Sequence, residues 1–185
     1  MNPKSMHVTP QPSLIARRPR RLFFCAILAG SALFSGAFAQ GKVQDPEFDK
    51  LLEGLLSHEV PESTVPDVQN DASVLFLDAR EREEYQVSHL PDAFWVGYDD
   101  FSPDRLRGVD KDRPIVVYCS VGYRSERVAE KLISEGFTRV SNLYGGIFEW
   151  VNQGCTLENE LGQTRAVHTY NRAWSKWVKA EEKVY

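Results

Sequence analysis

The chain has 185 residues, of which 42% are hydrophobic and 26% charged, with 12 Gly, 10 Pro and 3 Cys. This ordinary globular composition excludes collagen, coiled-coil and largely disordered classes, and the length fits one domain. Five of the 22 basic residues and none of the 26 acidic ones lie in residues 1–39, so the remainder holds 17 basic against 26 acidic residues. Such an acidic body argues against a nucleic-acid partner, because binding phosphates needs a basic surface.

Residues 1–39 have the pattern of a secretory signal peptide. A positive run, Arg-Arg-Pro-Arg-Arg at 17–21, precedes an apolar stretch that starts at Leu22 and closes with Ala-Phe-Ala. Small residues therefore occupy the two positions that a signal peptidase reads, and we predict cleavage between Ala39 and Gln40. The mature protein is then periplasmic or secreted and has no stable membrane association. The alternative is a retained anchor, but this stretch contains Gly and Ser and is near the lower length limit for crossing a bilayer.

The mature chain alternates helical and strand patterns. Residues 40–59 form an extension in which apolar residues at helical spacing predict an amphipathic helix over 48–56. Short apolar runs predict strands over 74–78, 93–96, 115–118 and 137–143, and helices are expected over 81–87, 124–135 and 147–151. The alternation with short connections predicts an α/β fold with a mostly parallel central sheet flanked by helices.

The C-terminal segment carries an aromatic stripe. Tyr170, Trp174 and Trp177 stand at i, i+4 and i+7, which predicts a helix within 155–185 that packs on the domain. A face that docks a partner is the alternative interpretation of the same stripe.

The strongest chemical signal follows the strand predicted over 115–118. The loop Cys119-Ser120-Val121-Gly122-Tyr123-Arg124-Ser125 connects it directly to a helix. Ligands of open parallel sheets bind at the carboxyl ends of the strands. A tight loop at a helix N-terminus gathers backbone N–H groups that stabilise an anion, including a thiolate. We therefore predict that Cys119 is a nucleophile, with a small buried core cysteine as the alternative.

Cleavage of the leader leaves only Cys119 and Cys155. An exported protein with two cysteines can carry one disulfide. Cys155 follows a predicted helix and has no charged partner in view, so an inert or pocket-lining thiol is favoured over a thiol that resolves a modified Cys119.

Several motifs, in order, resemble those of the rhodanese family of single-domain sulfurtransferases. They are Cys119-x-x-Gly122-x-Arg124-Ser125, Leu77-Asp78-Ala79-Arg80-Glu81, Glu84-Tyr85 with Ser88-His89-Leu90-Pro91-Asp92-Ala93, and Gly136-Phe137 with Leu143-Tyr144-Gly145-Gly146 and Trp150. The resemblance covers a core of about residues 60–154 and implies a rhodanese-like fold. Ser88 and Asp92 depart from the family pattern, which usually has Gly at both positions.

The resemblance implies a sulfurtransferase, and the predicted signal peptide implies that it is exported. Cys119 would carry a sulfane sulfur as a persulfide from an anionic or persulfide donor to a thiophilic acceptor, while the N–H groups of residues 120–125 stabilise it and Arg124 holds an anionic donor. The spacing Cys-x4-Arg is one residue shorter than the loop of phosphatases that share this fold, which disfavours phosphoryl transfer. A non-catalytic binding or sulfur-sensing module remains the alternative function.

The supporting residues have less specific signals. Asp78 and Arg80 stand at the carboxyl end of a predicted strand, where a contribution to the site is one interpretation, but the resemblance favours a brace of the fold near the loop. A structural role is favoured for His89, because an already ionised thiol needs no base. The sequence has no Cys/His cluster with zinc spacing and no phosphate-binding glycine fingerprint, so neither a metal nor a cofactor is expected. The expected partners are a small sulfur donor and acceptor, and the oligomeric state is left open.

Overall fold

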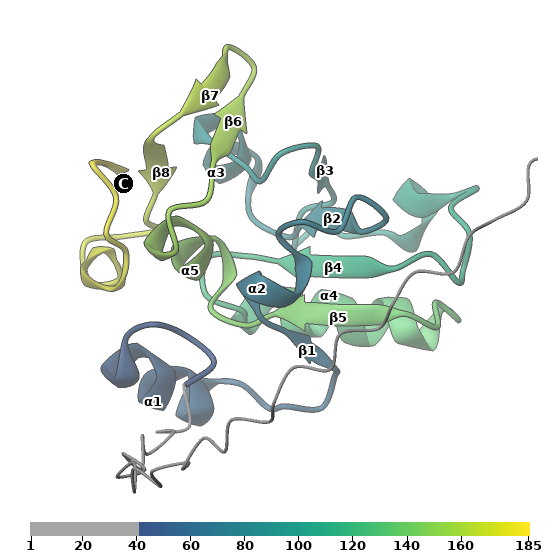
Figure 1. The fold of residues 1–185 in the computed structure, drawn as a ribbon. Helices are drawn as coiled ribbons and strands as arrows, with labels where there is room; N and C mark the ends of the chain where they lie inside the picture. Colours follow the sequence, from purple (N-terminus) through teal and green to yellow (C-terminus); the bar gives the residue numbers. More distant parts are fainter. Residues whose placement is uncertain (1–40) are drawn as a thin grey trace, which may run out of the picture. The chain divides into compact units, whose positions relative to one another are not determined.

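The computed structural model describes residues 41–185, so the predicted signal peptide, its cleavage site and the alternative anchor lie outside the described residues. The centre of the domain is a five-stranded sheet of order β1-β5-β4-β2-β3 (Figure 1). Every pairing in this sheet is parallel. The strands are β1 (Glu62–Ser63), β2 (Leu75–Asp78), β3 (Phe94–Trp95), β4 (Ile115–Tyr118) and β5 (Val140–Leu143).

Helices cover both faces of the sheet. One hydrophobic cluster joins it to α1 (Pro46–Leu55), α2 (Val65–Val68) and α5 (Gly146–Asn152). The opposite cluster joins it to α4 (Tyr123–Ser134) and the 3-10 turn η1 (Pro103–Leu106). The short helix α3 (Arg82–Val87) follows β2. The predicted α/β fold with a mostly parallel sheet is therefore confirmed.

The central strand β4 explains why residues 115–118 are all apolar. Val116 and Tyr118 pack in the first cluster, and Ile115 and Val117 pack in the second. Successive side chains of a strand point to opposite faces, and both faces of this sheet are covered, so no position of β4 tolerates a polar residue.

The C-terminal segment differs from its prediction. Instead of an α-helix, residues after α5 form β6 (Leu157–Asn159), β7 (Gly162–Thr164), β8 (Ala166–His168), the 3-10 turn η2 (Ser175–Trp177) and β9 (Glu182–Val184). β6 pairs with β7 as an antiparallel hairpin, whereas β8 and β9 pair in parallel. Parallel strands require the chain to cross back between them. Residues 169–181 make that crossover with the 3-10 turn η2 and no α-helix, so the predicted helix over the aromatic stripe is wrong.

Local geometry shows how the crossover uses the stripe. Tyr170 has φ 63°, and the Asn171 side chain accepts the N–H groups of Ala173 and Trp174. Trp177 stacks on Phe48 of α1 with ring centroids 5.5 Å apart. The expected packing on the domain is present, but it is made by a turn rather than by one helical face.

Two short elements escaped sequence analysis. β1 and α2 lie between the helix predicted over 48–56 and the strand predicted over 74–78, where no element was expected. Thr64 and Asp67 form a reciprocal capping box at the start of α2, which is the signal that could have located it.

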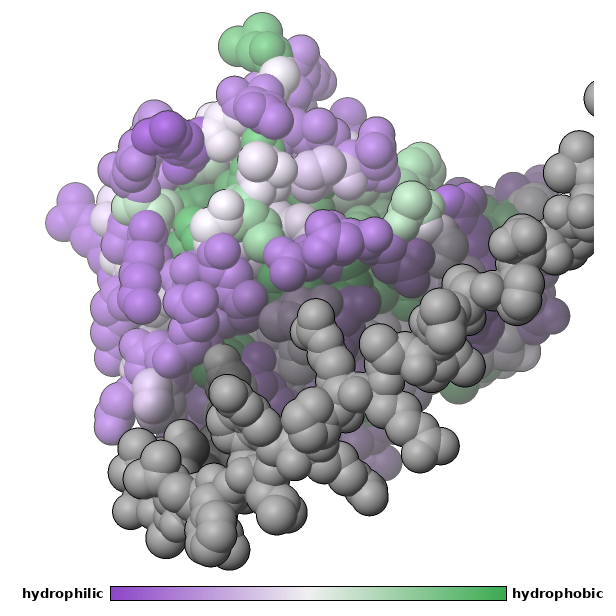
Figure 2. All heavy atoms as spheres, in the orientation of Figure 1, coloured by the Kyte–Doolittle hydropathy of each residue, from purple (hydrophilic) through white to green (hydrophobic). Residues whose placement is uncertain are grey.

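The surface is mostly hydrophilic in the view of Figure 2, with a hydrophobic projection at the end of the β6–β7 hairpin. Leu161, in the turn of that hairpin, is 97% exposed. Within residues 41–185, none of the helices has the length and apolar character needed to cross a bilayer.

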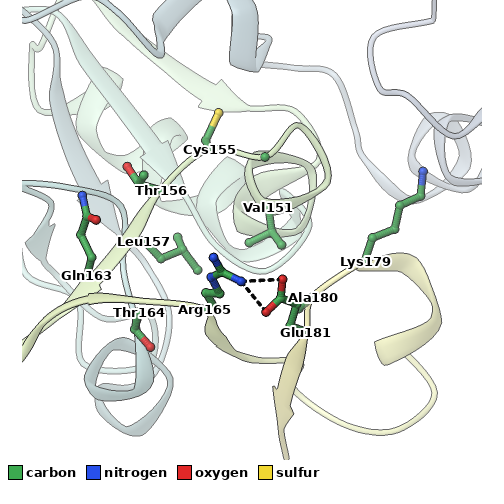
Figure 3. A pocket seen from close by; sticks show the side chains of 11 residues that line it. Val151, Cys155, Thr156, Leu157, Gln163, Thr164, Arg165, Lys179, Ala180 and Glu181 are labelled. Atoms are coloured by element: carbon green, nitrogen blue, oxygen red, sulfur yellow. Dashed lines mark hydrogen bonds and ion pairs between the residues drawn. The ribbon is translucent and has the colours of Figure 1, made fainter.

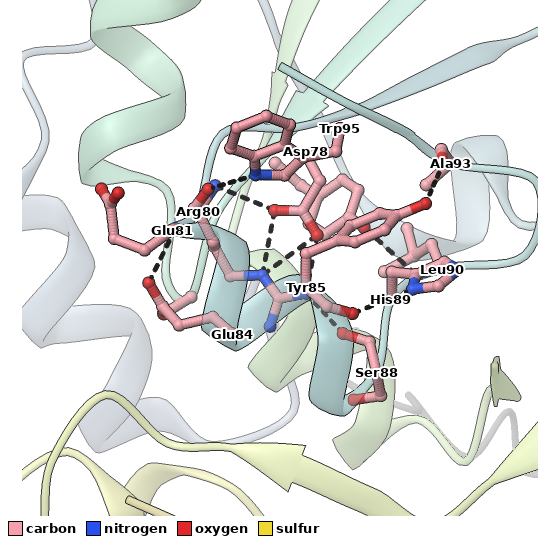
Figure 4. Close-up of polar contacts among 12 residues, drawn as sticks. Asp78, Arg80, Glu81, Glu84, Tyr85, Ser88, His89, Leu90, Ala93 and Trp95 are labelled. Atoms are coloured by element: carbon pink, nitrogen blue, oxygen red, sulfur yellow. Dashed lines mark hydrogen bonds and ion pairs between the residues drawn. The ribbon is translucent and has the colours of Figure 1, made fainter. Parts of the chain in front are cut away.

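A buried ion pair stabilises the end of β2 (Figure 4). Asp78 and Arg80 have no solvent-exposed surface, and Arg80 Nη2 lies 2.6 Å from Asp78 Oδ2. Arg80 Nη2 also donates to the Ser88 carbonyl at 2.6 Å, so the pair links β2 to the chain after α3. The geometry is that of the predicted brace.

Asp92, at one of the two departures from family glycines, has φ 57°, which an aspartate tolerates better than most residues.

We predict that Asp78→Asn destabilises the protein, because it leaves the Arg80 charge buried without a counter-charge. The expected loss of unfolding free energy is about 3–5 kcal/mol, measured by urea denaturation. Glu181→Gln is the matched control, since its partner Arg165 and Glu181 itself are largely exposed and its loss should change nothing measurable. Equal stabilities of the two variants would contradict the bracing role.

Candidate active site

Cys119 lies where β4 ends and the loop to α4 begins. It is 1% exposed, and its Sγ accepts the N–H of Gly122 at 3.2 Å. Gly122 has φ 120°, a conformation that residues with a Cβ rarely adopt. The loop therefore folds back on its own cysteine, and the glycine is what permits that fold.

The carbonyl groups of the loop are occupied by the rest of the protein. The N–H of Ile147 donates to the Cys119 carbonyl at 2.9 Å, and the N–H of Phe148 donates to the Ser120 carbonyl at 3.2 Å. Asn142 Nδ2 donates to the Gly122 carbonyl at 3.1 Å. Each of these carbonyl oxygens is thus directed to a protein donor instead of to a ligand.

Within residues 41–185, the N–H groups at the start of α4 have no such partners. The first residues of a helix have no acceptor within the helix, and no side chain caps α4 at Gly122. This twelve-residue helix also directs the positive end of its dipole toward the loop. Together these features form a site for an anion bound to Cys119 Sγ.

Asn142 and Ser125 hold the loop from beneath. Both are completely buried, and Ser125 Oγ lies 2.7 Å from Asn142 Oδ1. The predicted binding-loop residue Ser125 therefore lies below the loop and fixes its shape. Asn142, on the neighbouring strand β5, had no signal in the sequence beyond being a polar residue inside a predicted strand.

Arg124 is paired with a buried carboxylate that sequence analysis did not identify as a partner. Its Nη1 lies 2.6 Å from Glu84 Oε2, and its Nη2 lies 2.8 Å from Glu84 Oε1. Ser120 Oγ also donates to Glu84, at 3.1 Å. Both terminal nitrogens of the Arg124 guanidinium bind Glu84, so an anionic donor would meet a guanidinium whose charge is already balanced.

Electrostatics agree with this pairing. Burial alone would raise the pKa of the Glu84 carboxyl, but the hydrogen bonds and charge of Arg124 outweigh burial and lower the pKa. Burial would likewise lower the pKa of Arg124, and its hydrogen bond to Glu84 raises it instead. The pair is charged at neutral pH, and the two charges largely cancel.

A cavity of about 420 Å³ opens above the loop. Five loop residues line it, namely Cys119, Ser120, Val121, Tyr123 and Arg124. Its remaining walls are the side chains of Leu55, Glu81, Tyr98, Asp99, Tyr170 and Trp174. The loop prediction therefore identified the floor of the cavity, and the walls come from segments far away in the sequence.

The other candidates lie outside this cavity. His89 stacks on Tyr85 with ring centroids 3.9 Å apart, and its Nδ1 lies 3.0 Å from the Tyr85 carbonyl, which fits the structural role. Cys155 is a free thiol that lines a separate cavity of about 630 Å³, and the ion pair of Arg165 and Glu181 lines the same cavity farther from the thiol (Figure 3). Burial, and then the charge of Glu149, raises the pKa of the Cys155 thiol. Such a thiol is a poor nucleophile.

Among residues 41–185, no three His, Cys, Asp or Glu side chains gather closely enough to hold a metal ion. The loop itself presents one cysteine, a cluster of N–H donors and the ion pair of Arg124 and Glu84.

Comparisons with known proteins define the class to which this site belongs. Residues 63–153 match the Rhodanese-like domain family. The rhodanese-like domain of a protein from Anabaena sp. has a similar structure, with a TM-score of 0.50 and 26% identity, covering 54% of this chain and 79% of that one. A thiosulfate sulfurtransferase from Pseudomonas aeruginosa has a TM-score of 0.51 and 25% identity, covering 69% of this chain and 25% of that one.

Curated relatives match over 116 residues. A tRNA uridine(34) hydroxylase from Hamiltonella defensa is 34% identical, and one from Escherichia coli is 30% identical. These matches cover 59% and 60% of this chain but only 31% and 32% of the relatives, so the chain spans about a third of their length. Residues 63–153 belong to the rhodanese-like domain family.

We predict that Gly146→Ala displaces the cysteine loop. A Cβ at Gly146, where φ is 56°, would lie 2.4 Å from the Cys119 carbonyl oxygen and 2.7 Å from the Ser120 carbonyl carbon. We expect a loss of stability in urea and a changed rate of Cys119 alkylation by iodoacetamide. Gly154→Ala is the control, because Gly154 also has positive φ, 76°, but nothing within 4 Å of an added Cβ. Identical alkylation rates in the two variants would show that α5 does not position the loop.

We also predict that the contribution of Glu84 to stability depends on pH. The pKa of Glu84 in the folded protein is below its ordinary value of 4.5, so its contribution is fully present above that value and is lost as the pH falls through the folded pKa. Urea denaturation should show wild type more stable than Glu84→Gln at pH 7, with the difference shrinking below pH 4.5. Glu83→Gln, at an exposed position of α3, should show no such trend. A pH-independent difference for Glu84→Gln would contradict the assignment.

Proposed function

We propose that this protein is a sulfurtransferase that carries a sulfane sulfur as a persulfide on Cys119. The observation that supports this most strongly is the position of Cys119 Sγ, at the floor of a cavity, at the N-terminus of α4, and bonded to the N–H of Gly122. An added sulfur atom carries negative charge, and the uncapped N–H groups of α4 supply what an anion needs. The expected roles of Cys119 and of the loop N–H groups fit this geometry.

The proposed reaction has two balanced steps. The Cys119 thiolate attacks the outer sulfur of the donor, a new S–S bond forms, and the S–S bond of the donor breaks so that the donor leaves with the electron pair. An acceptor thiolate then attacks the outer sulfur of the Cys119 persulfide, and the Cys119 thiolate leaves. No external oxidant or reductant is required, because each step breaks one S–S bond for the one that it forms and the leaving group takes the electron pair of the broken bond.

The names of the curated relatives raise a second possibility, a role in tRNA hydroxylation. The match covers only about a third of those proteins. Residues 40–185 hold 17 basic against 26 acidic residues, and such a surface opposes binding of a polyanion. We therefore favour sulfur transfer to a small acceptor as the activity of this chain. The non-catalytic binding or sulfur-sensing module remains the alternative that the experiment below distinguishes.

We also propose that the protein acts outside the cytoplasm. The support is the composition of residues 1–39, with its positive run, apolar stretch and Ala-Phe-Ala ending. N-terminal sequencing of the protein isolated from its cell of origin tests this, and a chain that begins at Gln40 is the expected result.

Exposure of the reduced protein to a sulfur donor should add one sulfur atom to Cys119. Thiosulfate and glutathione persulfide are the donors to compare, and intact-mass spectrometry is the measurement. Cys119→Ser should gain nothing, whereas Cys155→Ser should behave as wild type, since Cys155 lies in a different cavity. Failure of wild type to gain sulfur from either donor would favour the binding module, and gain by Cys119→Ser would refute the mechanism.

A further inference from the structure

Carboxylates outnumber cations among the residues that line the cavity above Cys119. Glu81 and Asp99 both line it, and Arg124 is the only lysine or arginine among its lining residues. The guanidinium of Arg124 is already bound at 2.6 and 2.8 Å by Glu84 and reaches Glu81 only at 3.8 Å. The walls of the cavity are therefore net negative.

The environment of Glu81 is consistent with this charge balance. Burial raises the pKa of its carboxyl, Arg124 opposes the shift, and Asp99, Glu84 and Asp100 raise the pKa further. A negatively charged ligand that enters the cavity would be repelled by the carboxylates of Glu81 and Asp99, just as neighbouring carboxylates disfavour the charged form of Glu81.

Aromatic side chains form much of the remaining wall. Tyr98, Tyr123, Tyr170 and Trp174 all line the cavity. The faces of aromatic rings attract ammonium and guanidinium groups, most strongly where water is partly excluded. In this cavity Arg124 already lies over the Tyr170 ring at 5.4 Å. Carboxylates and ring faces together form the environment that a small organic cation prefers.

We propose that the small molecule that exchanges sulfur with Cys119 is an aminothiol, meaning a thiol or its persulfide that carries an ammonium group close to the sulfur. The inference rests on the proposed sulfur transfer and specifies its substrate. In the accepting direction, the aminothiol thiolate attacks the outer sulfur of the Cys119 persulfide, a new S–S bond forms, and the Cys119 thiolate leaves with the electron pair of the broken bond. The ammonium group lies between Glu81, Asp99 and the rings and takes no part in the bond changes.

The size of the cavity fits a small molecule. A volume of about 420 Å³ is within the range of about 300–1,000 Å³ found for small-ligand sites. Tyr170 and Trp174 come from the segment after the family match, which ends at residue 153, and Leu55 comes from α1 before it. The selectivity would therefore belong to this chain's own extensions and carboxylates as much as to the shared loop.

The test compares three small thiols on one persulfide. The full chain is loaded with inorganic polysulfide, freed of excess reagent and checked by intact mass for one added sulfur on Cys119. Its loss is then followed with cysteamine, 2-mercaptoethanol and mercaptoacetate, which carry a positive, a neutral and a negative group. Rates are expressed per concentration of thiolate. Wild type should prefer cysteamine over mercaptoacetate, and the preference should fall as ionic strength rises.

Variants distinguish the effect of the cavity charges on the reaction rate from the intrinsic reactivity of the three thiols. Removal of one partly solvated charge near the substrate should reduce the cysteamine-to-mercaptoacetate ratio about fivefold in Glu81→Gln and again in Asp99→Asn. Intrinsic differences between the thiols cancel because the same pair is compared in every variant. Glu130→Gln removes the same charge from the outer part of α4, where Glu130 pairs with Arg127, and should leave the ratio unchanged.

The outcomes distinguish the two proposals. A persulfide that forms on wild type but shows the same ratio in Glu81→Gln, Asp99→Asn and Glu130→Gln would overturn the aminothiol assignment and leave sulfur transfer intact. A wild type that forms no persulfide would overturn both.

A peptide of sequence Lys-Cys-Lys carries a thiol and ammonium groups as a protein substrate would. Faster reaction of this peptide than of cysteamine would overturn the assignment to a small molecule.

Discussion

The site depends on where the carbonyl groups of the cysteine loop find their donors. A tight turn between a strand and a helix directs N–H groups toward a ligand only if its carbonyl groups are held elsewhere. Here the N–H groups of Ile147 and Phe148 take two of them, and Asn142 takes a third. The start of α5 must lie against the loop for this to occur, and Gly146 leaves the necessary room, because a Cβ there would lie 2.4 Å from the Cys119 carbonyl oxygen. The anion-binding character of the loop is thus a consequence of helix-to-loop packing.

Charge within the site follows from one buried side chain. Glu84 is 3% exposed and binds both terminal nitrogens of Arg124 as well as Ser120. A buried charge without a partner is strongly unfavourable, so Arg124 and Glu84 stabilise each other. Arg124 thereby connects the loop to α3 and contributes little net positive charge to the cavity. Negative charge at Cys119 is therefore stabilised by backbone N–H groups. These groups act at short range and do not draw anions toward the cavity from a distance.

The segments that flank the family match complete the cavity. α1 contributes Leu55, and the crossover between β8 and β9 contributes Tyr170 and Trp174. Trp177 stacks on Phe48, and Asn152 at the end of α5 binds the Trp177 carbonyl and the Lys179 N–H. The two extensions therefore hold each other above the loop. A domain limited to residues 63–153 would contain the cysteine but not these walls.

The sequence by itself determined the order of the central elements and the floor of the site. Apolar runs fix strands such as β4 because both sheet faces are buried, and the loop from Cys119 to Ser125 is continuous in the chain, so its residues are neighbours by covalent connection. Only the tertiary structure decided the pairing of Arg124 with Glu84, 40 positions away, the support by Asn142, and the aromatic walls. The stripe at Tyr170, Trp174 and Trp177 has helical spacing, yet the structure has only the 3-10 turn η2 there. Tyr170 adopts a positive φ, and Trp177 stacks on Phe48 of the distant helix α1. The spacing of apolar residues indicates which secondary structure a segment favours in isolation. Contacts with distant segments determine which structure it adopts in the folded protein.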